Sequence, residues 1–197
     1  MNRIGIVILA AGASTRLGEP KQNLLFRDKG LLNHALAIAM ETNCAPILII
    51  TGAHTFKTDE INDSKAYVVQ NHDWQTGITS SISLGVSYLQ QKEPNISGVI
   101  LMVCDQPYVT STLLNQLIAE NIQTNIAIIA CSYQDTLGTP VLFNKAYFSD
   151  LTSLKGDEGA KKIIYQNLAN VASIPFEKGS IDIDTKEDYQ RLLALEE

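Results

Sequence analysis

A run of small residues followed by two cations comes directly after the first apolar segment of the chain. Small side chains at residues 10–15 allow backbone N–H groups to approach an anion closely, and Arg16 and Lys21 add positive charge. The guanidinium of an arginine can fork onto two phosphate oxygens, whereas a lysine ammonium acts as a point charge. The pattern predicts a phosphate-binding loop, although an ordinary solvated loop can have the same composition.

This loop differs from the two best-known phosphate-binding fingerprints. It has neither the G-x-G-x-x-G of dinucleotide-binding folds nor the G-x-x-x-x-G-K-[ST] of P-loop proteins. A simple dinucleotide-binding oxidoreductase domain is therefore disfavoured.

Carboxylates stand in two distant parts of the chain. Asp105 comes directly after the apolar run 98–104, and Asp182 and Asp184 alternate in a later segment. Alternation places the latter two on one face of an extended chain, where they repel each other unless a cation or solvent intervenes. Mg²⁺ favours one or two carboxylates together with phosphate oxygens and waters. These residues are therefore candidate metal ligands.

Each carboxylate could instead cap a helix. Thr110 and Ser111 are better placed than Asp105 to cap the helix that follows, because a proline intervenes. For Asp184 both interpretations stay open, since Asp184 and Thr185 both stand directly before a helical pattern.

Strands and helices alternate along the chain and place these groups together. Because parallel strands collect ligands at their carboxyl ends, the loop after the first strand and Asp105 after the fourth should share one rim. We expect a single α/β domain over residues 1–197, Rossmann-like and doubly wound, with a mostly parallel sheet. Buried strands are predicted at Ile4–Leu9, Pro46–Thr51, Ala66–Gln70, Gly98–Cys104 and Ile126–Cys131. Helices are predicted at Leu31–Asn43, Ile78–Gln91 and Thr110–Asn121, followed by a strand at Val141–Phe143, a helix at Glu158–Leu168, an extended segment at Asn170–Ile174 and a helix at Lys186–Leu195.

Composition narrows the range of partners. Of the 197 residues, 45% are hydrophobic and 18% are charged, which is ordinary for a globular domain, and the net charge is −6. A surface of this sign disfavours nucleic acid or an anionic membrane as a partner. The three cysteines show no metal-site or disulfide spacing, so we expect buried free thiols and a cytoplasmic location.

The segment LAAGASTRLGEPKQ (residues 9–22) resembles the signature of the nucleotidyltransferases that include molybdenum cofactor cytidylyltransferases and guanylyltransferases. CDQP (104–107) and DIDTKEDY (182–189) resemble the two acidic motifs of the same family. The resemblance implies a fold of the nucleotide-diphospho-sugar transferase type and Mg²⁺ as cofactor. It implies catalytic roles for Arg16, Lys21 and Asp105, and metal binding by Asp105 and Asp184 with Asp182 as a companion. The implied nucleotide-binding residues of this loop are Leu9, Ala10, Ala11, Gly12, Arg16 and Lys21.

Three further segments are similar to the molybdenum cofactor cytidylyltransferases in particular. In the first, N-x-x-W-x-x-G-x-x-x-S at residues 71–81, the resemblance implies that Asn71, Gly77 and Ser81 contribute to nucleotide binding. The other two, G-x-P at 138–140 and L-x-G-D-x-G-A at 154–160, lie near the acceptor in that family. They assign acceptor binding to Gly138, Pro140, Gly156 and Asp157. Read locally, the same residues could simply anchor a loop or begin a helix.

Together these resemblances imply transfer of CMP from CTP to molybdopterin with release of pyrophosphate. CTP is favoured over GTP because the first strand ends in L-A-A-G, whereas the guanylyltransferases usually carry L-A-G-G. A molybdoenzyme or its chaperone is a further expected partner. The alternatives are transfer with GTP, transfer to methylerythritol phosphate or a sugar phosphate, and a non-catalytic protein that handles the cofactor.

Overall fold

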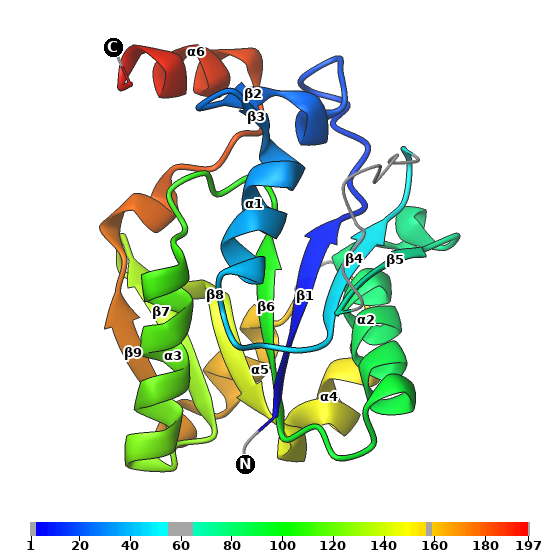
Figure 1. Cartoon of the computed structure of the whole chain (residues 1–197), viewed down its shortest axis with the longest axis vertical. Helices are drawn as coiled ribbons and strands as arrows, with labels where there is room; N and C mark the ends of the chain where they lie inside the picture. The colour runs from blue at the N-terminus through cyan, green and yellow to red at the C-terminus, as the bar shows by residue number, and fades with distance from the viewer. Residues whose placement is uncertain (1–2, 55–64, 157–158, 197) are drawn as a thin grey trace.

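The computed structural model describes residues 3–54, 65–156 and 159–196. In these residues the chain forms a seven-stranded sheet in which β8 runs antiparallel to both neighbours and the other pairs are parallel (Figure 1). The predicted α/β fold with a mostly parallel sheet is confirmed. The strands in spatial order are β5 (Ala66–Gln70), β4 (Ile47–Thr51), β1 (Ile4–Ala10), β6 (Gly98–Val103), β8 (Thr136–Asn144), β7 (Ile128–Tyr133) and β9 (Val171–Pro175).

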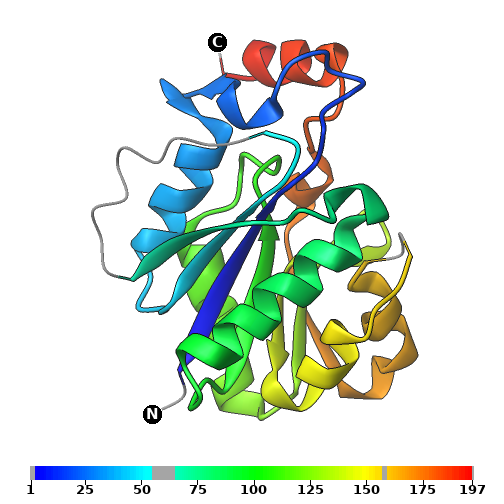
Figure 2. The same ribbon diagram turned by 90° about the vertical axis from the view of Figure 1, so that its right-hand side faces the viewer.

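Helices cover both faces of this sheet, as Figures 1 and 2 show. Side chains of α1 (Leu31–Met40) and α3 (Ser111–Thr124) belong to the core on one face. Those of α2 (Ile78–Lys92), α4 (Phe148–Thr152) and α5 (Lys161–Gln166) belong to the core on the other. This coverage explains why the central strands lack the alternation of a half-exposed strand.

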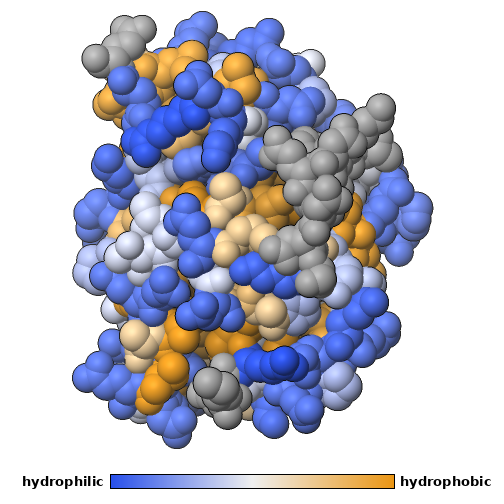
Figure 3. Space-filling view, viewed as in Figure 1, coloured by the Kyte–Doolittle hydropathy of each residue, from blue (hydrophilic) through white to orange (hydrophobic). Residues whose placement is uncertain are grey.

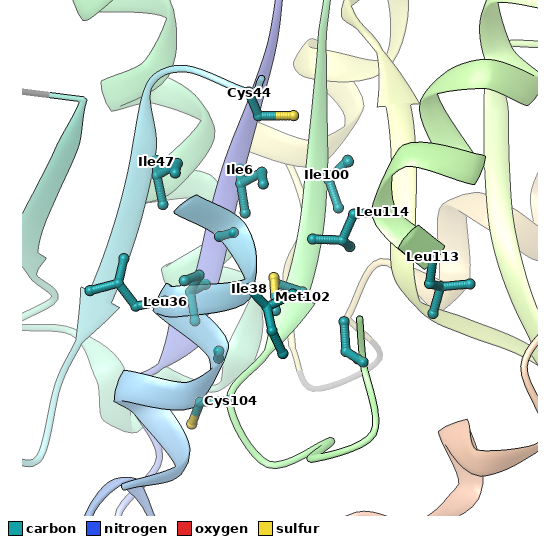
Figure 4. Packing of buried hydrophobic residues seen from close by; sticks show 14 of the residues in the cluster. Ile6, Leu36, Ile38, Cys44, Ile47, Ile100, Met102, Cys104, Leu113 and Leu114 are labelled. Carbon is teal, nitrogen blue, oxygen red and sulfur yellow. The ribbon is translucent and has the colours of Figure 1, made fainter. Parts of the chain in front are cut away.

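The central strands are buried almost completely. All seven residues of β1 are buried, and all but the last residue of β6 are. Figure 4 shows Leu36 of α1 and Leu114 of α3 on the face of the sheet that carries Ile6 and Ile100. Burying one such aliphatic side chain contributes about 1.5–3 kcal/mol, so the core holds the strand ends in fixed positions. The cysteines Cys44, Cys104 and Cys131 are buried free thiols, as predicted.

The second half of the sheet differs most from the prediction. The strand predicted at Ile126–Cys131 begins at Ile128 and runs to Tyr133, and the one predicted at Val141–Phe143 is part of the longer β8. These two strands form a hairpin whose turn has positive φ at Gln134 and Asp135. Such a turn normally favours Asn, Asp or Gly, so a glutamine there hid the hairpin from sequence reasoning.

Helical segments near the C-terminus are shorter than predicted. The predicted helix Glu158–Leu168 is α5 followed by a 3₁₀ turn at Leu168–Asn170, and Glu158 lies outside the described residues. Helix α6 (Lys186–Ala194) matches its prediction to within one residue. The five residues of α4 were not predicted as a helix, because a segment of that length shows no helical period.

A small cap lies at the carboxyl end of the sheet, at the top of Figure 1. It combines α6 with a two-stranded hairpin of β2 (Leu25–Phe26) and β3 (Lys29–Gly30). Figure 3 shows apolar surface at this end of the molecule, where Leu25, Leu193 and Leu195 are exposed. A third core cluster, separate from the two on the sheet, holds the cap together: Leu17, Leu24, Phe26, Leu31, Ile183 and Leu192.

Helix α2 approaches β1 closely at Gly85, where an added Cβ would lie 2.7 Å from a methyl carbon of Val7. We expect Gly85→Val to lower the free energy of unfolding by about 1–3 kcal/mol, because the extra volume overpacks the contact. Urea unfolding measures this change. Gln90→Val, at an exposed position of the same helix, controls for helix propensity; equal losses in the two variants would contradict the close approach.

Candidate active site

The loop after β1 turns sharply and is tied back to the strand. The amides of Leu17 and Gly18 both donate to the carbonyl of Ser14, at 3.1 Å each. The Ser14 hydroxyl in turn accepts from the backbone amide of Lys21 at 3.1 Å. Lys21 begins a short 3₁₀ helix, Lys21–Asn23, whose buried Gln22 donates to the carbonyl of Ala10 at 2.7 Å. The backbone of Lys21 is therefore held beside the end of β1.

Asp105 and the segment before α6 meet across the top of the sheet. The amide of Ile183 donates to the carbonyl of Asp105 at 3.1 Å. The Ile183 side chain is fully buried in the cap cluster, which also contains Leu17. Burial of the residue between Asp182 and Asp184 turns these two aspartates away from the cluster, as alternation predicts.

Two cations and two carboxylates converge at this point. The Lys21 ammonium donates to Asp105 Oδ2 at 2.6 Å and to Asp184 Oδ1 at 2.7 Å. The Arg16 guanidinium donates to the other oxygen of Asp184 at 2.7 Å. Lys21 is enclosed, with 12% of its side chain exposed, whereas Arg16 is 69% exposed. Formal charges balance within the group, so three distant segments are joined without net charge.

The surroundings shift the protonation of this group. Burial alone would lower the pKa of Lys21, but attraction and hydrogen bonds from Asp105 and Asp184 raise it above its usual value, so the ammonium stays charged. Burial opposes ionisation of Asp184, yet its hydrogen bonds and charge contacts with Lys21 and Arg16 lower its pKa. Burial, followed by the charges of Asp105 and Asp184, raises the pKa of Asp182.

Other residues cap the two helices that follow these aspartates. The Thr110 hydroxyl accepts from the Leu113 amide at 3.2 Å and caps α3. At α6 the cap is Thr185, which accepts from the Asp188 amide while Asp188 accepts from the Thr185 amide, a capping box. Asp184 therefore directs its side chain to Lys21 and Arg16 and does not cap the helix.

A cleft of about 360 Å³ extends from this charge cluster along the carboxyl ends of β1 and β6. Most of the residues predicted to bind nucleotide lie in the wall of this cleft. Arg16 does not line the cleft, and its guanidinium contacts Asp184 in the charge cluster. Trp74, Gln22 and Gln75 also line it, although none of these three was among the predicted site residues. The predicted residues in the wall are Leu9, Ala10, Ala11, Gly12, Lys21, Gly77, Ser81 and Asp105.

Asn71 supports the cleft from behind and is not part of its wall. Its side-chain amide donates to the hydroxyls of Ser80 at 2.8 Å and Ser81 at 2.9 Å. Its carbonyl oxygen accepts from the backbone amide of Asp73 at 2.9 Å. Asn71 is buried, and its hydrogen bond holds Ser81, which lines the cleft.

Sequence reasoning missed Gly52, which follows β4. An added Cβ at this position would lie 2.6 Å from the Ala11 carbonyl and 2.7 Å from the Trp74 Cβ. Glycine is required there because the loop after β1 and the segment that carries Trp74 both approach its backbone. The local signal, one glycine at the end of a strand, was too common to single it out.

Of the residues assigned to the acceptor, the structure places Gly138 in the wall of a second, mostly apolar cavity of about 190 Å³. It adjoins the first cleft, with Leu9, Ile78 and Val103 in both walls. Gly138 lines this second cavity, while Pro140 is buried in β8 and lines neither. The carbonyl of Gly156 accepts from the Thr79 hydroxyl of α2 at 2.7 Å. Asp157 lies outside the described residues.

The carboxylates suit a divalent cation in combination with phosphate oxygens. Within residues 3–54, 65–156 and 159–196 no group of three or more His, Cys, Asp or Glu side chains is arranged to hold a metal ion. Asp105 and Asp184 nevertheless face one point, which the Lys21 ammonium occupies. Two carboxylate oxygens from the protein, with the rest from a phosphorylated ligand and water, match the preference of Mg²⁺.

Comparison with known proteins shows the family to which the chain belongs. The model of the MobA-like NTP transferase domain matches residues 6–171, and the chain belongs to that family. Family membership implies a nucleotidyltransferase with an NTP and an acceptor as substrates. In the described part of the chain, no helix has the length and apolarity needed to span a membrane.

Relatives in this family carry different names at similar identity. Nicotine blue oxidoreductase of Paenarthrobacter nicotinovorans is 28% identical, with 95% of each chain covered. Purine catabolism protein PucB of Bacillus subtilis is 25% identical (93% of this chain and 92% of that protein). Molybdenum cofactor cytidylyltransferase of Escherichia coli is 23% identical (96% and 95%). These identities do not single out one substrate.

A solved structure supports the fold and a metal in a relative. The crystal structure of Rv0371C from Mycobacterium tuberculosis in complex with manganese has a TM-score of 0.75 and 27% identity, covering 98% of this chain and 99% of that one. The structure of that relative holds manganese.

The lowered pKa of Asp184 predicts how stability depends on pH. A carboxyl group whose pKa is lower in the folded state adds stability above its unfolded pKa of about 3.9, and this is lost as pH falls through the folded pKa. Asp184→Asn should therefore be less stable than the parent chain at about pH 7, and the difference should be smaller at about pH 3, below the unfolded pKa.

Urea unfolding at both pH values in a chelating buffer measures the difference. Asp150→Asn, which changes an exposed carboxylate on α4, is the control. A deficit of Asp184→Asn that stays constant with pH would show that the ion pairs do not stabilise the fold.

Proposed function

We propose that the chain transfers CMP from CTP to the phosphate of molybdopterin and releases pyrophosphate. The proposal rests mainly on the convergence of Arg16 and Lys21 with Asp105 and Asp184 at the end of a cleft formed by the loop after β1. Cations suited to phosphates and carboxylates suited to a metal are the two components that transfer of a nucleotidyl group requires.

In the proposed reaction, a phosphate oxygen of the acceptor attacks the α-phosphorus of the NTP. A new P–O bond forms, the bond to the bridging α–β oxygen breaks, and pyrophosphate leaves with that electron pair. The acceptor phosphate is largely ionised near neutral pH, so no strong general base is needed. The chain therefore acts chiefly by positioning the reactants and balancing their charge.

Each part of the cluster has a role in this scheme. The backbone N–H groups of the loop, together with Arg16 and Lys21, hold the β- and γ-phosphates. Asp105 and Asp184 are the residues that would hold Mg²⁺, with Asp182 beside them. When bound, Mg²⁺ supplies positive charge to the phosphate oxygens. Lys21 and Arg16 stabilise the negative charge of the leaving pyrophosphate.

The choice of base depends on the inner end of the cleft. Ala10 and Ala11 line it and make this end narrower than a glycine at position 11 would, which favours the smaller pyrimidine. The Ser81 hydroxyl, oriented by Asn71, can hydrogen-bond to a base edge or ribose. A difference of one methyl group is worth about 1–3 kcal/mol between two substrates, which is enough for a preference but not for exclusion.

The acceptor would place its ring system in the second cavity. The walls are mainly aliphatic, including Ile82, Val141 and Ile164, and Lys161 adds one cation. A flat heterocycle such as a pterin fits such walls better than a sugar phosphate or methylerythritol phosphate, which present hydroxyls on all sides. Delivery of the product to a molybdoenzyme or its chaperone, in the cytoplasm, belongs to the same proposal.

The substrates are tested by incubating the purified chain with each NTP, Mg²⁺ and one of three acceptors. The acceptors are molybdopterin, methylerythritol phosphate and a sugar phosphate, and pyrophosphate release is measured. Release with CTP and molybdopterin alone is expected. Release with another pair would replace the substrate assignment, and no release with any pair would favour a non-catalytic protein that handles the cofactor.

Asp105→Asn should fold and lose turnover by about 10²–10³-fold, because it removes one of the two carboxylates that would hold Mg²⁺ at the reacting phosphates. Pyrophosphate release measures turnover, and urea unfolding checks the fold. Asp73→Asn, outside the cleft wall, is the matched control and should keep its turnover. If Asp105→Asn kept full turnover, the carboxylate would have only a structural role.

A further inference from the structure

The Lys21 ammonium lies at the point that both candidate metal ligands face. It is 2.6 Å from Asp105 Oδ2 and 2.7 Å from Asp184 Oδ1. A Mg²⁺ ion bound to the same two oxygens, at its usual distance of about 2.0–2.1 Å, would overlap the ammonium. The ammonium and a divalent cation therefore cannot share these two carboxylates.

The Lys21 ammonium could instead reach an anion bound in the first cleft. Its backbone is fixed by Ser14 and by the 3₁₀ turn that follows, and its side chain also forms part of the cleft wall. Rotation of the long side chain moves the ammonium from the carboxylates to an anion in the cleft while the loop stays in place. Arg16 is mostly exposed and can make the same exchange from Asp184 at little cost.

We propose that Lys21 acts as an internal placeholder for the metal, so that divalent cation and triphosphate bind cooperatively. The inference rests on the proposed binding of an NTP in the cleft. A triphosphate attracts Lys21 away from Asp105 and Asp184. The two carboxylates, no longer paired with Lys21, then bind the cation. Without the anion, the cation has to displace an ammonium held by two ion pairs, and its affinity is low.

Cooperativity of this kind has a consequence for the reaction. By linkage, the cation strengthens triphosphate binding by the same factor by which the triphosphate strengthens cation binding. The carboxylates stay paired with Lys21 until a triphosphate binds, so Asp105 and Asp184 do not sequester metal ions in the empty cleft. Lys21 would thus be a positioning residue for the metal as well as a ligand of the phosphates.

The test measures binding of Mn²⁺ alone, without nucleotide, by electron paramagnetic resonance. Lys21→Met should bind Mn²⁺ more tightly than the parent chain by roughly 5- to 150-fold, the usual range of coupling between sites. Lys145→Met removes an exposed lysine at the opposite end of the sheet, beside the start of β6, and should bind like the parent chain. Adding Asp105→Asn to Lys21→Met should abolish the gain.

Two results would overturn the proposal: Mn²⁺ affinity in Lys21→Met that is no higher than in the parent chain, or a gain that persists when Asp105→Asn is added. If Lys21→Met does not fold in the absence of metal, Lys21→Gln provides the same comparison with a neutral side chain that can still hydrogen-bond to one carboxylate. The proposed reaction is tested separately by pyrophosphate release from the unmodified chain, so either idea can fail without the other.

Discussion

Pairing of two cations with two carboxylates at the carboxyl end of the sheet is the interaction on which the site depends. Lys21 and Arg16 come from the loop after β1, Asp105 from the end of β6, and Asp184 from the segment before α6. An enclosed ammonium or carboxylate without a partner would be costly, so Lys21, Asp105 and Asp184 stabilise one another, whereas the exposed Arg16 does not depend on its pairing. These ion pairs can also be exchanged, because a phosphate can replace a carboxylate beside Lys21 or Arg16 and a cation can replace Lys21 or Arg16 beside a carboxylate.

Apolar packing explains why these groups meet. Leu17 directly follows Arg16, Ile183 directly precedes Asp184, and both are buried in the cluster that joins the cap to the loop. The hydrogen bond from the Ile183 amide to the Asp105 carbonyl joins the segment after β6 to the other two. Helix α6 begins with its own capping box and thereby leaves Asp184 available. The hydrophobic cluster thus holds the charged residues that flank it in register.

In the proposed function, one of two adjoining cavities takes the nucleotide and the other takes the acceptor. The first has backbone and cations at one end, and the second has aliphatic walls. Gly52 and Gly85 permit the close approaches that shape them, the former between the loop after β1 and Trp74, the latter between α2 and β1. The relatives that match this chain at similar identity carry different names.

Local patterns in the sequence were sufficient to predict the main-sheet strands and the helices of the first half, because apolar runs act over a few residues, and the small-residue turn led to the prediction of a phosphate loop. The short strands β2 and β3 of the cap were not predicted. Sequence patterns also singled out Asp105 and Asp184, which stand directly beside buried segments, as candidate metal ligands. The hairpin of β7 and β8, the need for glycine at position 52 and the supporting role of Asn71 depend on neighbours distant in the chain. Only the tertiary structure showed that Lys21 bridges the two aspartates, because an ion pair across 84 and 163 positions is set by packing and leaves no mark on local sequence.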